Sequence, residues 1–273
     1  MVTELRPSTL APALAQLNAE PTLIFAGGTD LMVHELKPHN AILFVDAIEE
    51  LQQIEVYENS IRIGAGCRLA QLVEHTALPR NLVQALHQIA APALRNVATI
   101  GGNIVNASPA ADSLPALTLL DAKVCLQNVN GERWLPIDEF IIGPGKTILQ
   151  PGEMLTQVEI ARIPCHHSMY HKVGTRAANA LSKLSVAALA RFDDSGALED
   201  WRIAFGAVAP TVVRNRDIEL SLIGCKPEEV DMEQLLGSYD ALLHPIDDQR
   251  STAEYRRRAS LNLLKHWMEQ LQQ

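Results

Sequence analysis

Two pairs of adjacent glycines, Gly27-Gly28 and Gly101-Gly102, follow short apolar runs that are typical of strands. Glycine lets the backbone come close to a ligand, and consecutive main-chain N–H groups form a concavity that binds an anion without Lys or Arg. A β-carbon at Gly101 or Gly102 would occupy that space. A tight turn without any ligand explains either pair alone equally well. Because two loops can converge on one ligand, the two pairs together predict a pyrophosphate site. The small polar residues that flank them are Thr29, Asp30, Thr99 and Asn103.

Three further motifs are weaker. "GAGCRLA" begins like a dinucleotide fingerprint, but Leu69 holds the third glycine position, so the segment indicates a plain strand end. "GPGKT" ends like a P-loop, yet Pro144 stands where a phosphate-binding amide is needed, which favours a turn. "CHHSMYH" lacks an acidic partner at ligand spacing, and we expect no metal site there.

The composition excludes several classes of protein. The 273 residues carry a net charge of −9, so the basic footprint of a nucleic-acid-binding protein is missing. The basic run "YRRRAS" indicates a solvated or partner-facing stripe of a terminal helix. The N-terminus has no apolar signal region, and no apolar run approaches the about 20 residues of a membrane span. Four scattered cysteines suit a reducing compartment, and we expect a cytoplasmic protein.

The elements that must position the first glycine pair form a small β-α-β-like unit. The pattern predicts a helix over residues 8–20, because Leu10, Leu14 and Leu17 share one face. A buried strand over 22–26 then ends at the first pair, and a short helix and a second strand over 41–47 follow. Ligands of such units bind at strand ends.

The middle of the chain mixes hairpins and helices. Alternation over 54–66 predicts an antiparallel hairpin, and Asn130-Gly131 marks a second hairpin over 123–136. Helical segments are expected over 67–75, 81–90 and 92–103, with another helix beginning near Asp112. A turn and a further strand are expected within 143–160.

The last third predicts three strands, over 168–175, 184–192 and 201–209, followed by helical segments from 215 to 271. Strands followed by helices favour an α+β subdomain. Soft boundaries near Val56 and Pro164 divide the chain into subdomains 1–56, 57–165 and 166–273.

The segments "FAGGTDLMV" and "RNVATIGGNIVNASPAADSLPAL" resemble the two FAD-binding signatures of the flavoprotein subunits of molybdenum hydroxylases, the group that includes xanthine dehydrogenase. The resemblance extends over nearly the whole chain, through "IRIGAG", "GPGKTILQPGEML", "FGAVAPTVVR" and "STAEYRRRAS". It implies an α+β, FAD-binding (PCMH-type) fold. Two N-terminal α/β subdomains would be followed by a C-terminal antiparallel sheet with helices.

The resemblance also implies contacts with FAD. Main-chain N–H groups of both glycine loops would hold the pyrophosphate, and Asp112 would bind sugar or ribityl hydroxyls unless it only caps a helix. Lys172 and Leu181 would lie near the isoalloxazine ring, although "AANA" departs there from many relatives. The full set is Ala26, Gly27, Gly28, Thr29, Asp30, Leu31, Thr99, Ile100, Gly101, Gly102, Asn103, Asn106, Asp112, Lys172 and Leu181.

The implied function is electron transfer in a complex similar to xanthine dehydrogenase. The chain would take electrons from [2Fe-2S] centres of an iron–sulfur subunit and pass them through FAD to NAD⁺ or another acceptor. Hydroxylation would occur at the molybdenum cofactor of a molybdopterin subunit. No side chain is expected to be catalytic, because a flavin carries its own chemistry. The alternatives are a stand-alone small FAD-dependent oxidase and a flavin-free assembly subunit. A visible spectrum separates the flavin-free subunit from the two flavin-containing proteins.

Overall fold

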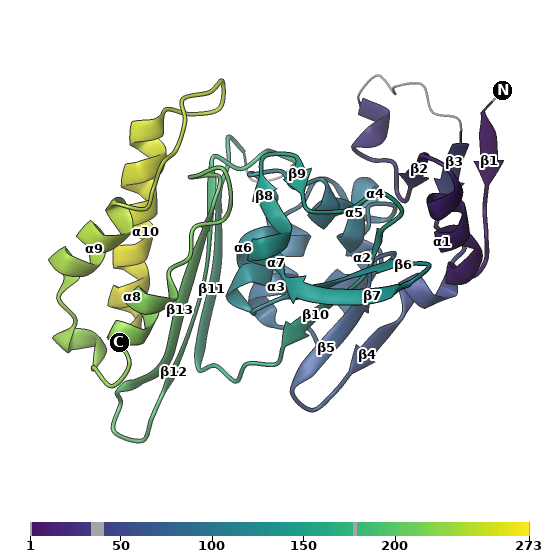
Figure 1. Cartoon of the computed structure of the whole chain (residues 1–273). Helices are drawn as coiled ribbons and strands as arrows, with labels where there is room; N and C mark the ends of the chain where they lie inside the picture. Colours follow the sequence, from purple (N-terminus) through teal and green to yellow (C-terminus); the bar gives the residue numbers. More distant parts are fainter. Residues whose placement is uncertain (1, 34–40, 177–178, 273) are drawn as a thin grey trace. The chain divides into compact units, whose positions relative to one another are not determined.

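The computed structural model describes residues 2–33, 41–176 and 179–272 (Figure 1). The chain divides into two compact units that interleave in sequence. The first contains Met1–Leu78, Ala90–Ser108 and Asp121–Arg162, and the second contains Pro79–Ile89, Pro109–Leu120 and Ile163–Gln273. The three subdomains expected from the sequence stay a prediction.

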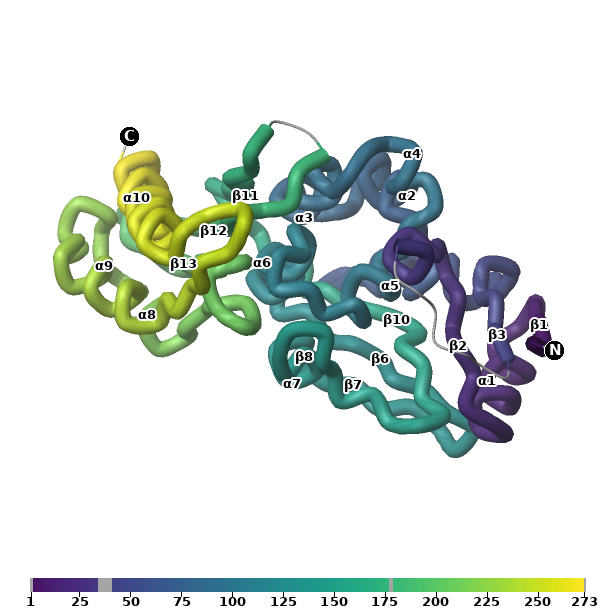
Figure 2. The backbone as a smooth tube through the Cα atoms, turned by 90° about the horizontal axis from the view of Figure 1, so that it is seen from above, coloured from purple at the N-terminus to yellow at the C-terminus, as the bar shows by residue number. Residues whose placement is uncertain are grey.

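A small parallel sheet opens the first unit. Its order is β1-β3-β2, formed by β1 (Thr3–Leu5), β3 (Ala41–Phe44) and β2 (Thr22–Phe25). Helix α1 (Leu10–Ala19) lies beside it, and its buried leucines share a core with Leu43 (Figure 2). The expected helix and the two later strands are therefore confirmed. Strand β1 was not expected, because three mostly exposed residues carry no hydrophobic pattern.

The rest of the first unit is built on an antiparallel sheet of order β4-β5-β10-β6-β7. Both expected hairpins are present in it. Its strands are β4 (Ile54–Val56), β5 (Ser60–Gly64), β10 (Met154–Ala161), β6 (Lys123–Asn128) and β7 (Gly131–Pro136). The shorter elements are η1 (Leu31–Val33), η2 (Glu49–Gln52), α7 (Ile137–Phe140), β8 (Ile141–Gly143) and β9 (Lys146–Thr147).

Three short helices complete this unit: α2 (Leu69–Glu74), α4 (Pro92–Arg95) and α5 (Ile100–Val105). The single helical segment expected over 92–103 is wrong. Thr99 lies between α4 and α5 in an extended conformation, with φ −110° and ψ 156°, and its backbone pairs with Arg68. That pairing competes with the helix and divides it in two.

The second unit contains the expected antiparallel sheet of three strands, β11 (His167–Val173), β12 (Leu184–Phe192) and β13 (Leu198–Gly206). Helices α3 (Arg80–His87) and α6 (Ser113–Leu119) lie against it on one side. The other side is covered by α8 (Arg216–Ser221), α9 (Met232–Asp240) and α10 (Ala253–Leu271), with η3 (Pro227–Glu229) between them (Figure 1). Because both faces are covered, β12 is buried continuously from Leu184 to Ala190.

The basic run on α10 is only partly a solvated stripe, which corrects the sequence interpretation. Arg256 is buried, donating to the Ala207 carbonyl at 3.0 Å and to Asp248 Oδ1 at 2.6 Å. Burial raises the pKa of Asp248, but hydrogen bonds from Arg256 and two main-chain N–H groups outweigh this and bring it to about 2. Arg256 therefore anchors the start of α10, while Arg257 pairs with Asp240 at the surface.

Candidate functional site

The first glycine loop follows β2 and presents unpaired N–H groups. Among the described residues, none accepts a hydrogen bond from the main-chain N–H of Gly27, Gly28, Thr29 or Asp30. Gly28 has φ +66°, a conformation that favours glycine. Consecutive free amides of this kind form an anion-binding concavity. Ala26 and Leu31 flank them and are partly exposed.

The second glycine pair does not end a strand, as the sequence suggested, but lies in the first turn of α5. The Thr99 hydroxyl caps this helix by accepting from Gly102 N at 3.1 Å. The N–H of Gly101 donates to the Ala65 carbonyl at 2.9 Å, and that of Asn103 donates to the Thr99 carbonyl at 3.0 Å. The amides of this segment thus have protein acceptors, unlike those of the first loop.

The two glycines of α5 have different surroundings. A Cβ on Gly101 would lie 2.6 Å from Ala65 Cβ and 2.7 Å from the Ala65 carbonyl oxygen, so protein fills the space expected for a ligand. Gly102 is exposed, and its Cβ would meet only Thr99 Oγ1, at 3.0 Å. The packing of the protein therefore explains the first glycine and not the second. Asn106, just after α5, is exposed as well.

The structure brings the two glycine loops together within the first unit. A Cβ on Gly27 would lie 2.0 Å from the carbonyl oxygen of Val97, two residues before Thr99. Glycine is the residue that allows this approach. The candidate segments from Ala26 to Leu31 and from Thr99 to Asn106 therefore lie close to each other in the first unit, so one ligand could contact both.

A third segment supports this site, and sequence reasoning missed it. Residues 64–68, for which the sequence indicates a plain strand end, lie beside the start of α5. The Ile100 N–H donates to the Cys67 carbonyl at 3.0 Å, and the Leu69 N–H donates to the Ala98 carbonyl at 2.9 Å. The only sequence signal was the small-residue run "GAG", which many strand ends share.

Asp112 belongs to the second unit, at the start of α6, and is 6% exposed. Its side chain makes no cap hydrogen bond, so the alternative that it only caps the helix is wrong. Lys172 Nζ donates to Asp112 Oδ2 at 2.6 Å, and the hydroxyls of Tyr170 and Ser182 donate to Oδ1. Two predicted site residues, Asp112 and Lys172, therefore form one buried cluster. Tyr170 and Ser182 were not predicted.

Leu181 lies beside this cluster in sequence and is 65% exposed, whereas its neighbour Ser182 is fully buried. The Lys183 N–H donates to the Val173 carbonyl at 2.8 Å and closes the base of the β11–β12 connection. An exposed leucine on a connection held in this way can present an apolar surface to a flat ring. Residues 177–178, in the middle of the expected ring-facing segment, lie outside the described residues.

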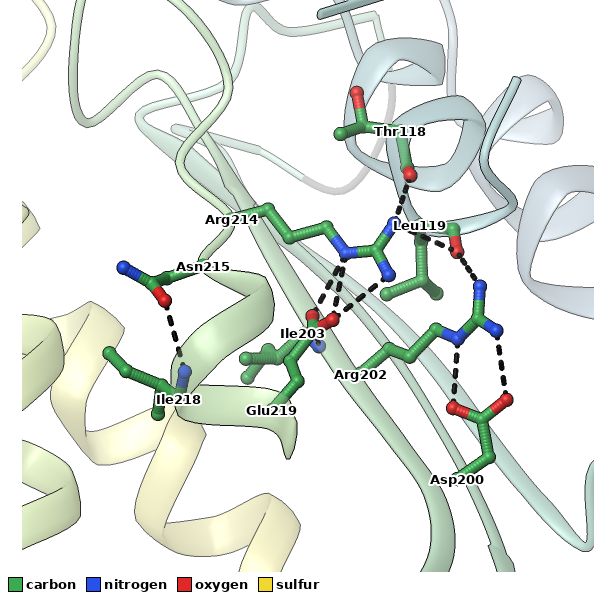
Figure 3. A network of polar contacts seen from close by, with 9 residues as sticks. All are labelled: Thr118, Leu119, Asp200, Arg202, Ile203, Arg214, Asn215, Ile218 and Glu219. Carbon is green, nitrogen blue, oxygen red and sulfur yellow. Dashed lines mark hydrogen bonds and ion pairs between the residues drawn. The ribbon is translucent and has the colours of Figure 1, made fainter. Parts of the chain in front are cut away.

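The carboxyl end of α6 is held by two arginines (Figure 3). Arg214 Nη1 donates to the Thr118 carbonyl at 2.6 Å, and Arg202 Nη1 donates to the Leu119 carbonyl at 3.2 Å. Arg214 also forms a buried ion pair with Glu219, with Nε 2.9 Å from Oε1. Carbonyls at a helix end lack partners within the helix, and cations there complement its dipole. The helix that begins at Asp112 is thus held by side-chain contacts at both ends.

Two histidines of "CHHSMYH" pack on an aromatic ring. His166 stacks on Phe192 with centroids 6.1 Å apart, and His167 meets the same ring edge-on at 5.7 Å. Within the described ranges, no group of three His, Cys, Asp or Glu residues could hold a metal ion. No helix among the described residues is long and apolar enough to cross a bilayer.

Comparison with known proteins covers nearly the whole chain. Residues 1–163 match the family model "FAD binding domain in molybdopterin dehydrogenase", and residues 169–271 match "CO dehydrogenase flavoprotein C-terminal domain". The chain is 34% identical over 262 residues to the xanthine dehydrogenase FAD-binding subunit of Escherichia coli O157:H7, covering 92% of this chain and 89% of that protein. It is 29% identical to the nicotinate dehydrogenase FAD-subunit of Eubacterium barkeri, covering 95% and 92%.

Solved structures agree on the fold. A chain of the reconstituted CO dehydrogenase from Oligotropha carboxidovorans superposes with a TM-score of 0.90 at 24% identity, covering 97% of this chain and 96% of that one. The resemblance drawn from the glycine motifs and the α+β fold expected from it are both confirmed.

Proposed function

Because the chain belongs to the FAD-binding subunits of molybdenum hydroxylases, we propose that it transfers electrons from a partner's [2Fe-2S] centres, through FAD, to NAD⁺ or another acceptor. The amides of Gly27–Asp30, which have no acceptor among the described residues, carry this proposal, because they suit a pyrophosphate. Bound FAD supplies the redox chemistry by cycling between oxidised and reduced forms. The protein supplies binding and orientation.

Each unit, taken by itself, offers groups that suit FAD. In the first unit, the neutral amides of Gly27–Asp30 and the open surface above Gly102 suit the diphosphate. In the second unit, Asp112 and Lys172 offer hydrogen bonds, and Leu181 offers an apolar surface for the ring. Asp112 is a carboxylate, so it suits an uncharged part of FAD and not the phosphates.

The proposed partners are an iron–sulfur subunit and a molybdopterin subunit that carries out hydroxylation. This proposal is supported by the relatives, which are named as subunits of dehydrogenases and are similar in length to this chain. We also propose a cytoplasmic location, supported by four free cysteines.

Anaerobic mixing with NADH tests the choice of acceptor. The FAD-loaded protein is expected to lose its visible flavin band on addition of NADH, because hydride transfer from NADH is the reverse of the proposed step. If the band stays with NADH and NADPH and bleaches with dithionite, NAD⁺ is not the acceptor. If the protein binds no FAD, the flavin-free assembly subunit is the correct alternative.

Gly102→Ala tests the diphosphate site. The added methyl meets only the Thr99 hydroxyl in the protein, so the fold is expected to keep its melting temperature. FAD affinity is expected to fall about tenfold, or about 1.4 kcal/mol, because the methyl enters the space assigned to the cofactor. The matched control is Gly237→Ala on α9, whose Cβ meets nothing within 4 Å. If Gly102→Ala binds FAD as tightly as the wild type, α5 is not part of the diphosphate site.

A further inference from the structure

We propose that Tyr170 and Ser182 are positioning residues for the Asp112–Lys172 pair, which they arrange to bind one uncharged group of FAD that both donates and accepts a hydrogen bond. This inference rests on the proposed function. Neither hydroxyl was expected at the site from the sequence. Both hydroxyls act through Asp112. They donate to one of its carboxylate oxygens and so leave the other oxygen available to the ligand.

The hydrogen bonds to Asp112 are divided between its two oxygens. Oδ1 accepts from Tyr170 Oη at 3.1 Å and from the Ser182 hydroxyl, while Oδ2 accepts from Lys172 Nζ at 2.6 Å. Lys172 Nζ also donates to the Gln88 carbonyl at 2.9 Å. A carboxylate oxygen has two lone-pair sites and an ammonium has three N–H groups. Among the described residues, one acceptor site on Oδ2 and one N–H of Lys172 are therefore left over.

The geometry of the cluster is fixed by its surroundings. Tyr170 and Lys172 are two residues apart on β11 and so share one face of the sheet. Ser182 is fully buried just before β12, and Tyr170 is 7% exposed. Burial and the neighbouring Asp112 raise the pKa of Tyr170 well above its usual value, so the phenol keeps its proton. Both hydroxyls must therefore donate, since the ionised carboxylate can only accept.

The unused acceptor site on Asp112 Oδ2 and the unused N–H of Lys172 define the kind of ligand group that can bind. An acceptor beside a cationic donor matches the imide edge of an isoalloxazine, where N3–H lies next to a carbonyl. It matches equally the hydroxyls of a ribityl chain or a ribose. A phosphate, which carries no proton to donate, does not match it. Without the two hydroxyls, Oδ1 would have free lone pairs, and both Lys172 and the ligand could shift between the oxygens.

Single-atom variants test this role. Tyr170→Phe and Ser182→Ala are each expected to weaken FAD binding about tenfold, because hydrogen bonds to a charged group are strong and directional. If the bound group is the imide edge of the isoalloxazine, both variants are also expected to shift the visible band of the bound flavin. The matched controls are Tyr239→Phe, whose buried hydroxyl has no partner among the described residues, and Ser260→Ala, whose hydroxyl bonds only within α10. These controls are expected to leave both the affinity and the spectrum unchanged.

The ligand group is identified with N3-methyl-FAD and ADP as probes. If the imide edge binds, the wild type prefers FAD to N3-methyl-FAD and Tyr170→Phe loses that preference. If a ribityl hydroxyl binds, the two flavins bind alike and Tyr170→Phe weakens both equally. Weakened ADP binding in Tyr170→Phe assigns the ribose instead.

Two failures are distinguishable. A wild-type protein that binds no flavin contradicts the proposed function itself. Variants that keep the wild-type FAD affinity, in a protein that does bind FAD, overturn the positioning role alone. Circular dichroism and melting curves of the flavin-free proteins verify folding. If Ser182→Ala fails to fold, Tyr170→Phe, which loses one oxygen and no packing volume, decides the question.

Discussion

Replacing Arg214 with alanine is expected to lower the free energy of unfolding of the flavin-free protein by about 3–5 kcal/mol. The guanidinium is 5% exposed and its partner Glu219 is 7% exposed, so the variant leaves a buried carboxylate without its cation. Burial already raises the pKa of Glu219 despite Arg214. The carbonyl of Thr118, at the end of α6, loses a donor as well.

The measurement is urea unfolding followed by circular dichroism. Arg258→Ala, on the exposed face of α10, is the control and is expected to change the free energy by less than about 0.5 kcal/mol. Adding Glu219→Gln to Arg214→Ala is expected to recover part of the loss, because the double variant buries no unpaired charge. Equal stability of Arg214→Ala and the wild type would show that α6 does not depend on this contact.

The glycine loops show how much of the site could be predicted from the sequence. Glycine pairs after apolar runs have a local physical meaning, so the sequence predicts both loops as candidates. What each glycine contacts depends on the fold. Gly101 packs on Ala65 and Gly27 packs on Val97, and neither partner has a feature that marks it in the sequence. The same holds for the segment 64–68, whose role is to accept hydrogen bonds through its backbone.

Buried polar clusters were the harder part. Asp112 was expected at the cofactor, but its hydroxyl partners lie 58 and 70 residues away. A tyrosine in a strand and a serine before one are ordinary in a sequence. Arg256 was misjudged for a similar reason, because a run of three arginines does not show which one turns inward to Asp248. Hydrophobic periodicity, in contrast, located the sheet and helices of the second unit, since it reflects burial directly.

Gly27→Ala is expected to weaken FAD binding about 100-fold. The new Cβ would lie 2.0 Å from the Val97 carbonyl oxygen and 2.7 Å from its carbon, too close for any side chain. Val97 cannot retreat easily, because its N–H and that of Ala98 donate to the Leu94 carbonyl, while the Ala98 carbonyl accepts from Leu69. The first loop must therefore move away from α5. Losing two amide-to-phosphate hydrogen bonds of about 1.5 kcal/mol each gives about this factor.

FAD titration followed by flavin fluorescence measures the affinity, and melting of the flavin-free protein measures the damage to the fold. Some loss of stability, about 1–3 kcal/mol, is expected from the overpacking at Val97. Gly102→Ala separates the two effects, because it changes the proposed diphosphate site without a clash against the backbone. If Gly27→Ala binds FAD as tightly as the wild type, the amides of the first loop do not hold the pyrophosphate. The diphosphate would then have to be assigned to other donors, because the amides of Gly101 and Asn103 already bond within the protein.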